Sequence, residues 1–407
     1  MITKKTIGSF GELGVPRAFR SLEAISIFMT LGALCLVGCT GEHLVEPTEE
    51  TKPEPVEIQE PVEKQKTPLY LTGYVAPYGN ADEALTRAFT IPEGYVVPTE
   101  YMPIGAYFTR DIPGEDPQVE ERRILHSSVD NKWYYTPPIE IPDNDYQLYG
   151  FMPYNSADVT ITPNTKYADG ATLYLRGMNI VSTKDVCVMV GAKHGTDAET
   201  PVSPLLTGNF DCHMFNGAGT ANYLFLLFDH LYASISFRFS VDEYYAKLRT
   251  IHLKKLQLTA YTDAAFEHPR KREVNATVVL RKTTNGSSPI QSITFEDNGS
   301  ELVDNETFFN DDIELTPVNW SEEIAYVPYT GSYYYVLRSI YDVYDKKGNL
   351  IRHSVAENKI NLRHILNISD TDMQRGKKYV LKLIIRPTYL YQLSDQDLDN
   401  PSVADIQ

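Results

Sequence analysis

Residues 231–241, "LYASISFRFSV", alternate between apolar and polar side chains along almost their whole length. A two-residue period is typical of a β-strand, because successive side chains of a strand point to opposite faces. The pattern therefore predicts a strand with one buried face and one face in contact with water. The apolar face would consist of Leu231, Ala233, Ile235, Phe237, Phe239 and Val241, and the wet face of Ser234, Ser236, Arg238 and Ser240.

Similar strand patterns recur from residue 68 almost to the end of the chain. "LYLTGYVAP" (69–77) alternates, and "YYYVLRSIYDVYDKKGNLIRHSVAENKINL" (333–362) is typical of two strands joined by a turn at 346–349. "KKYVLKLIIRP" (377–387) supplies another strand that ends at its proline. Only "SVDEYYAKLRTI" (240–251) indicates a short helix, capped by its first serine, with a loop or single turn as the alternative. We expect an all-β fold, two sandwiches in series.

An uncharged apolar run, residues 25–38, follows basic residues near the N-terminus and stops at Cys39. Basic, apolar and then small residues are the order of a secretory signal, and the run is too short for a stable membrane anchor. The residues "LVGC" (36–39) match the bacterial lipobox, in which the cysteine is acylated and becomes the first mature residue. We predict a lipoprotein signal peptide over 1–38 and a lipid, such as palmitate, on Cys39.

The residues that follow the lipobox differ in composition from the rest of the chain. Residues 39–67 are rich in Glu, Pro, Lys and Thr and contain no aromatic residue. Such a composition buries too little apolar surface to fold, so we predict a Pro- and Glu-rich tether between the lipid and the folded body. About 340 residues remain beyond it, enough for two domains that each bury a core.

The charge of the mature chain argues against nucleic acid as a partner. Removal of residues 1–38 takes away four basic and two acidic side chains and leaves 33 Lys and Arg against 52 Asp and Glu. A surface with this excess of negative charge repels phosphates.

A search for catalytic or metal-binding motifs finds nothing strong. The sequence lacks a phosphate-binding glycine loop, a His-Glu-x-x-His motif, paired Cys-x-x-Cys motifs and a Gly-x-Ser-x-Gly elbow. Cys212 and His213, with His194 upstream, are a weak zinc pattern, and the aspartates of "SDQDLDN" (394–400) lack the glycine and glutamate of a calcium loop. We expect no enzyme, no cofactor and no metal; whether Cys187 pairs with Cys212 stays open.

Three segments resemble the fimbrillin family of Bacteroidales pilins and their accessory subunits. "FLLFDHLYASISFRF" (225–239) is similar to the signature that opens the second domain of that family. "KWYYTPPIEIPDNDYQLYGFMPYN" (132–155) is similar to a segment of its first domain, and "RGKKYVLKLII" (375–385) resembles its last core strand. The resemblance implies two tandem transthyretin-like β-sandwich domains, an N-terminal one over 68–222 and a C-terminal one over 223–407 with a short acidic tail.

The same resemblance implies a route of assembly. In that family the lipoprotein reaches the outer membrane and the cell surface, where a trypsin-like protease cuts after an arginine beyond the first strand. Loss of the strand opens a groove that a strand of another fimbrial subunit fills, which pairs backbone groups and covers apolar surface at once. Residues 78–94, the loop that follows the first strand, contain a single basic residue, Arg87. We therefore predict that the protease cuts after Arg87.

The role within a fimbrium depends on the tail. After Ile385 only Tyr389, Tyr391 and Leu393 alternate before aspartates and a proline interrupt, which makes a poor donor strand. A tip or accessory adhesin with a host or bacterial receptor is therefore favoured over a stalk subunit, and an anchor subunit remains open.

A rival interpretation is a glycan-binding surface lipoprotein. Trp133, Tyr134 and Tyr135 are the aromatic residues that could stack on sugar rings.

Overall fold

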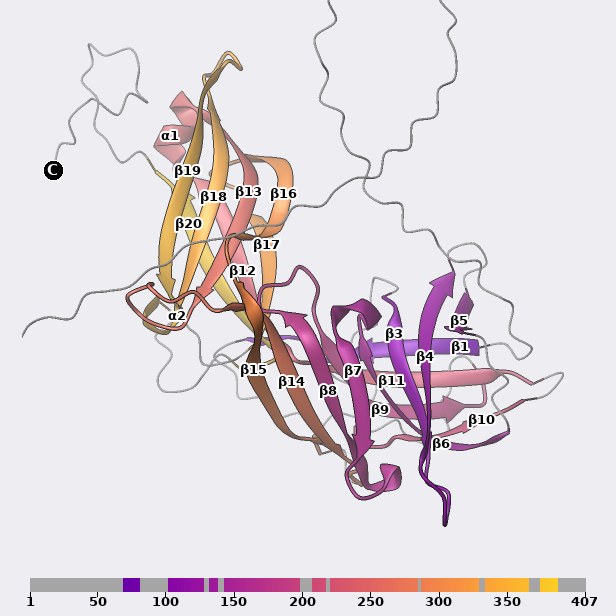
Figure 1. The fold of residues 1–407 in the computed structure, drawn as a ribbon. Coiled ribbons are helices and arrows are strands. Elements are labelled where there is room, and N and C mark those ends of the chain that lie inside the picture. The colour runs from indigo at the N-terminus through magenta and orange to yellow at the C-terminus, as the bar shows by residue number, and fades with distance from the viewer. Residues whose placement is uncertain are drawn as a thin grey trace, which may run out of the picture. The chain divides into compact units, whose positions relative to one another are not determined.

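The structure is a computed structural model that describes residues 69–80, 102–127, 132–137, 143–197, 207–216, 220–284, 287–328, 334–365 and 374–386. It is all-β, and the helices in these ranges are short (Figure 1). No helix among the described residues is both long enough and apolar enough to cross a bilayer. The predicted signal peptide, Cys39, the tether, Arg87 and the tail beyond Arg386 lie outside the described residues.

The largest sheet has eight strands, in the order β10-β6-β3-β4-β5-β1-β11-β9. Their bounds are β1 Leu69–Val75, β3 Ile104–Arg110, β4 Gln118–Ser127, β5 Lys132–Thr136, β6 Asn144–Met152, β9 Cys187–Gly195, β10 Asp211–Met214 and β11 Asn222–His230. β6 also pairs with β9, the last strand of that order. The seven strands from β6 to β9 therefore form a closed ring, which leaves out only β10 of this sheet.

Three four-stranded sheets complete the described body. Their orders are β15-β14-β8-β7, β17-β12-β20-β2 and β16-β13-β18-β19. The bounds are β2 Gly79–Asn80, β7 Asp158–Pro163, β8 Gly170–Asn179, β12 Tyr232–Val241, β13 Thr250–Tyr261, β14 Lys271–Arg281, β15 Ile290–Leu302, β16 Glu306–Leu315, β17 Ser321–Pro328, β18 Tyr334–Tyr344, β19 Leu350–Asn361 and β20 Lys377–Ile385. Short helical turns lie at α1 Glu243–Leu248, α2 Leu362–Ile365, η1 Tyr154–Ser156 and η2 Tyr167–Asp169.

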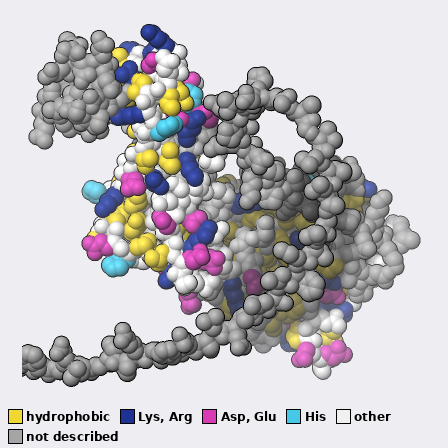
Figure 2. All heavy atoms as spheres, turned by 45° about the horizontal axis from the view of Figure 1, so that its top comes forward, with side chains coloured by type: hydrophobic (Ala, Val, Ile, Leu, Met, Phe, Trp, Pro, Cys, Tyr) yellow, Lys and Arg dark blue, Asp and Glu magenta, His cyan; other side chains and the backbone are white. Residues whose placement is uncertain are grey.

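Two hydrophobic cores hold these sheets together. The smaller, which we call the interior cluster, is built only from strands of the eight-stranded sheet and includes Ile124, Leu148 and Leu226, each fully buried. The larger core extends through the other three sheets and onto one face of the first. Phe237 of β12 and Phe308 of β16 pack across it with ring centres 5.2 Å apart. Figure 2 shows hydrophobic side chains next to charges of both signs on the outer surface.

The hairpin of β14 and β15 joins a sheet with strands that precede it by about 100 residues. β14 pairs antiparallel with β8, so that Val278 lies opposite Leu173 and Leu280 opposite Ala171. All four side chains are fully buried, and Figure 1 shows β15, β14, β8 and β7 side by side. Burial of this apolar face explains why the hairpin leaves the sheet of its neighbours β13 and β16.

The predicted alternation of β12 is confirmed, but its predicted wet face is wrong. Ser234, Ser236 and Ser240 are all buried, and only Arg238 is partly exposed. The reason is that β12 lies between β17 and β20, whose charged side chains reach over that face. Glu322 of β17 accepts a hydrogen bond from Ser236 and forms an ion pair with Lys378 of β20 at 2.6 Å.

Two local predictions also have clear outcomes. The turn at 346–349 is confirmed: it joins β18 to β19, with Gly348 at a φ of +86°. The short helix is present as α1, but Asp242 caps it instead of Ser240. The Asp242 carboxylate accepts hydrogen bonds from the N–H groups of Tyr244 and Tyr245, a typical N-cap arrangement.

Candidate functional site

The first described strand, β1, lies inside the largest sheet. All seven of its residues pair in parallel with β11, from Leu69 opposite Asn222 to Val75 opposite Phe228. On its other side β1 pairs with β5 through Leu69 and Trp133 alone among the described residues. β1 is thus held mainly by β11, and it completes the ring between β11 and β5.

The two faces of β1 contact different cores, as its alternation predicts. Leu69 and Val75 are buried in the interior cluster, with Leu71 partly buried beside them. Tyr74, on the opposite face, packs against the larger core. A buried Leu or Val side chain stabilises a fold by about 1.5–3 kcal/mol, so β1 contributes a substantial part of the stability of a typical domain.

The residues that follow β1 in sequence are hydrogen-bonded to the rest of the folded body. The N–H of Ala76 donates to the carbonyl oxygen of Phe228 at 3.0 Å. The chain then passes to β2, which pairs in parallel with β20 at Lys377 and Lys378. Residues 69–80, which we call the β1 segment, therefore contribute strands to two sheets.

A buried polar cluster holds the β1 segment just beyond the strand. His230, the last residue of β11, lies opposite Cys187, the first residue of β9. The Nε2 of His230 donates to the carbonyl oxygen of Ala76 at 2.5 Å, and its Nδ1 contacts the Asp185 carboxylate. Cys187 Sγ lies 3.3 Å from Asp185 Oδ2 and 3.5 Å from His230 Nδ1. We call Asp185, Cys187 and His230 the Asp185 cluster.

The surroundings of His230 favour its charged form. Burial lowers the pKa of His230, but the carboxylates of Asp185 and Asp229 and the Ala76 carbonyl together outweigh burial, and the net pKa is raised. Both ring nitrogens face hydrogen-bond acceptors, an arrangement that favours the doubly protonated ring. The ring of Tyr78 stacks on it with centres 3.8 Å apart. Next to it, the Asp229 carboxylate forms an ion pair with Arg375 at 2.6 Å.

The predicted glycan platform does not form one surface. Trp133 and Tyr135 both pack with the interior cluster, Tyr135 fully buried and Trp133 partly so. Tyr134 lies between them in β5 and therefore points to the opposite face. The ring of His126 lies edge-on to that of Trp133, with ring centres 5.1 Å apart.

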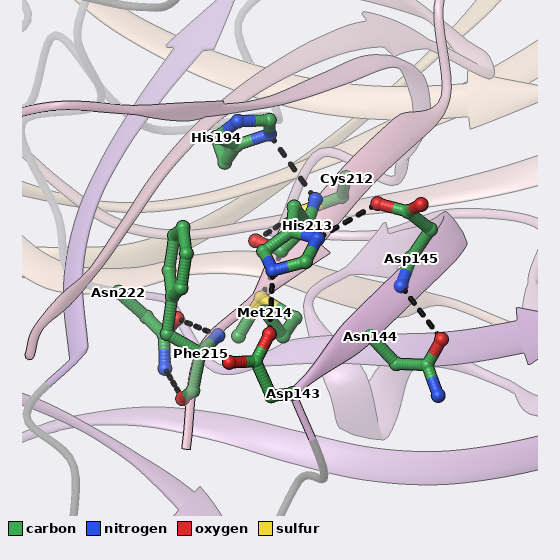
Figure 3. A network of polar contacts seen from close by, with 9 residues as sticks. All are labelled: Asp143, Asn144, Asp145, His194, Cys212, His213, Met214, Phe215 and Asn222. Carbon is green, nitrogen blue, oxygen red and sulfur yellow. Dashed lines mark hydrogen bonds and ion pairs between the residues drawn. The ribbon is translucent and has the colours of Figure 1, made fainter. Parts of the chain in front are cut away.

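The weak zinc pattern of Cys212 and His213 is divided between two faces of β10. Cys212 Sγ points into the interior cluster, 3.7 Å from Met214 Sδ. The His213 ring lies between two exposed aspartates, with Nε2 2.7 Å from Asp143 and Nδ1 2.7 Å from Asp145 (Figure 3). Burial lowers the pKa of His213, but both aspartates outweigh it and the net pKa is raised. The Nδ1 of His194 accepts the backbone N–H of His213 at 3.1 Å.

Both cysteines of the described body, Cys187 and Cys212, are buried, reduced thiols. The sequence patterns indicate Cys212, and not Cys187, as a weak candidate metal ligand and therefore do not group the residues of the Asp185 cluster. The only local signal is the spacing of Asp185 and Cys187, which places both on one side of an extended chain. His230 comes 43 residues after Cys187, and only the pairing of β9 with β11 brings them together.

A groove of about 550 Å³ lies beside α1, at the ends of β12 and β20. Trp320 and Val318 line it, and Val318 is 82% exposed. The ammonium group of Lys382 lies 5.9 Å from the centre of the Trp320 ring. Asp242 and Arg386 add one charge of each sign to the lining.

No protein-family model matches the chain, and no curated protein matches it. Several solved structures do match the chain. A protein of Bacteroides fragilis described as a cell adhesion protein is 8% identical, with 78% of this chain and 92% of that chain covered and a TM-score of 0.37. A fimbrial protein of Bacteroides vulgatus is 13% identical, with 77% and 95% covered and a TM-score of 0.32.

The fimbrial anchor protein Mfa2 of Porphyromonas gingivalis is 12% identical, with 77% of this chain and 90% of that chain covered and a TM-score of 0.24. These three structures are described as adhesion or fimbrial proteins, and none of them as an enzyme.

Proposed function

We propose that this protein is a fimbrial subunit of the cell surface, a tip or accessory adhesin that assembles by strand exchange. In this proposal its fold is a pair of tandem transthyretin-like sandwiches, predicted over residues 68–222 and 223–407, although β11 and the hairpin of β14 and β15, which lie almost entirely in the second range, pair with strands of the first. The precursor is held at the outer membrane by a lipid on Cys39. Its partners are other fimbrial subunits and a receptor on a host or bacterial surface.

The position of β1 is the observation that carries this proposal. β1 is paired along its whole length with β11 but at a single position with β5. Because β1 is the first strand of the described body, a single cut at Arg87 would separate the β1 segment from the rest of the chain; only the short strand β2, which pairs with β20 at two positions, would leave with it. Its departure would leave one edge of β11 unpaired, the other edge staying paired with β9, and would uncover the interior cluster. Another subunit's alternating strand would satisfy both needs.

The remaining parts of the proposal come from the sequence. Arg87 follows β1 and is the predicted cleavage site, and the tail beyond Ile385 alternates too briefly to act as a donor. A chain that accepts a strand but offers none ends a fimbrium or decorates it, and does not polymerise.

The test compares two forms of the chain. One begins at Ala88, and the other is the full chain with Arg87→Ala, which keeps β1. Each is mixed with co-expressed candidate pilins and examined on an unboiled detergent gel and by electron microscopy. We expect a complex that resists detergent only with the form that begins at Ala88, because strand insertion buries a ladder of backbone hydrogen bonds.

Two outcomes would contradict the proposal. Filaments of the truncated chain alone would assign it to the stalk instead of the tip. Failure to form a complex with any co-expressed subunit would remove the strand-exchange role altogether.

The groove at Trp320 favours a second candidate function, that of a glycan-binding surface lipoprotein. An exposed aromatic ring flanked by charged side chains suits the apolar face and hydroxyl groups of a sugar. A glycan array tests it: binding that Trp320→Ala abolishes and Trp133→Ala leaves unchanged would support this function at the groove. Absence of any bound glycan would contradict it.

A further inference from the structure

The Asp185 cluster has the composition of a transition-metal site. A carboxylate, a thiol and an imidazole present one ligand atom each, and these atoms lie within 4.8 Å of one another. In a tetrahedral zinc site with bonds of about 2.0–2.3 Å, neighbouring ligand atoms are about 3.5 Å apart. The two separations from Cys187 Sγ, 3.3 Å to Asp185 and 3.5 Å to His230, match this geometry, whereas Asp185 and His230 Nδ1 are in direct contact and would have to move apart.

The second nitrogen of His230 is held as it is in most metal-binding histidines. Such residues usually donate their other N–H to a carboxylate or a backbone carbonyl, which fixes the ring and directs its free nitrogen to the metal. Here Nε2 donates to the Ala76 carbonyl oxygen at 2.5 Å, and Nδ1 faces Asp185 and Cys187. The His230 side chain is only 3% exposed, so this orientation is enforced by packing.

Two buried polar atoms at the cluster make no hydrogen bond of acceptable geometry within the described residues, although the Tyr78 and Asp185 side chains lie close enough to interact. They are Asp185 Oδ1 and the hydroxyl oxygen of Tyr78. Burial and then the Asp185 carboxylate, which also contacts the Tyr78 side chain, raise the pKa of Tyr78. Buried polar atoms are normally satisfied, so an additional ligand at this position would complete the site.

The charges of the cluster also suit a divalent cation. Without metal, a doubly protonated His230 would balance the Asp185 carboxylate beside a neutral Cys187 thiol. A divalent ion would displace one proton from His230 Nδ1 and one from Cys187 Sγ. The thiolate and the carboxylate then neutralise the ion, so the buried site carries no net charge in either state.

We infer that Asp185, Cys187 and His230 bind one Zn²⁺ ion, with a fourth position open to the Tyr78 hydroxyl or to water. Thiolate, imidazole and carboxylate together are typical zinc ligands, and they exclude calcium and magnesium, which prefer oxygen. Binding requires the Asp185 carboxylate to turn from its direct contact with Nδ1. Its side chain is 13% exposed, so the ion enters from the Asp185 side. This inference stands independently of the proposed function.

Cobalt is the probe, because a cobalt–thiolate bond gives a charge-transfer absorption band that zinc abolishes by displacement. The protein is the full chain with Cys35→Ser and Cys39→Ser, so that Cys187 and Cys212 are its only thiols. We expect the band to saturate at about one equivalent of Co²⁺. Roughly two protons should be released per ion, measured with a pH indicator.

Cys212 provides a matched control, because it is the other buried thiol of the described body. In the same background, Cys212→Ser should keep the cobalt band and Cys187→Ser should lose it, with circular dichroism to show that both remain folded. If Cys187→Ser does not fold, mass-spectrometric mapping of alkylation answers the same question in the unsubstituted chain. Zinc should then slow the alkylation of Cys187 at least tenfold.

Three results would overturn the inference. They are absence of a cobalt band, a band that depends on Cys212, and alkylation of Cys187 at the same rate with and without zinc.

Discussion

Replacement of Leu69 by alanine should lower the affinity of the folded body for strand β1 far more than replacement of its neighbour Tyr70. Leu69 is 3% exposed and packs in the interior cluster, whereas Tyr70 is 38% exposed on the opposite face of the strand. Tyr70 stacks on Tyr223 with ring centres 5.0 Å apart. The two changes leave the backbone pairing with β11 intact, so they separate the contribution of the apolar groove from that of the hydrogen-bond ladder.

The expected magnitudes follow from this burial. Leu→Ala at a buried position costs about 2–5 kcal/mol, and the middle of that range corresponds to a change of roughly 100- to 1,000-fold in an equilibrium constant. An exposed aromatic stack contributes about 0.5–1.5 kcal/mol, so Tyr70→Ala should change the same constant about tenfold or less. Because related complexes differ mainly in their dissociation rates, the difference should appear as faster release of the strand.

The assay uses the chain after a cut at Arg87, either by trypsin or through a specific protease site placed there. A fluorophore on the released N-terminal fragment reports its dissociation when the cut protein is diluted. The uncut chain, in which the β1 segment stays covalently attached, is the control. Equal release rates for Leu69→Ala and Tyr70→Ala would refute the argument, because they would show that the interior cluster does not retain the strand.

Four further predictions concern other parts of the chain. Cys39→Ala should abolish metabolic labelling with palmitate; unchanged labelling would contradict the lipobox interpretation. Glu322→Gln should lower the free energy of unfolding by about 1–2 kcal/mol at pH 7 and by little near pH 2 in urea titrations. Hydrogen bonds from Lys378 and then Ser236 lower the pKa of Glu322 from 4.5 to about 2. The stabilisation by ionised Glu322 is therefore complete above pH 4.5 and is lost toward pH 2. An equal loss of unfolding free energy at both pH values would refute this. Cys212 should resist alkylation at pH 8 until urea unfolds the protein, because burial raises the pKa of its thiol; rapid labelling of the folded protein would contradict it. Gly170→Ala should cost about 2–4 kcal/mol in the same titrations, because its Cβ would lie 2.2 Å from the Leu280 carbonyl oxygen at a φ of +140°; a neutral change would contradict the close approach of β8 to β14 at this position.

The sequence alone was sufficient for the features that depend on neighbouring residues. The alternation of β1 and β12 and the turn between β18 and β19 could be predicted, because a strand orients successive side chains to opposite faces and a tight turn requires particular residues. The all-β class followed from these local patterns. The lipobox at Cys39, the tether and Arg87 are local patterns too, and they remain predictions.

Only the tertiary structure decided which strands meet. The hairpin of β14 and β15 pairs with β8, a partner about 100 residues earlier in the chain that no local pattern identifies. The serines of β12 are buried because Glu322 and Lys378 come from neighbouring strands. The Asp185 cluster exists because β9 and β11 place Cys187 opposite His230 and the β1 segment covers both. Contacts between distant segments depend on how whole faces are buried together, and the composition of a single segment does not contain that information.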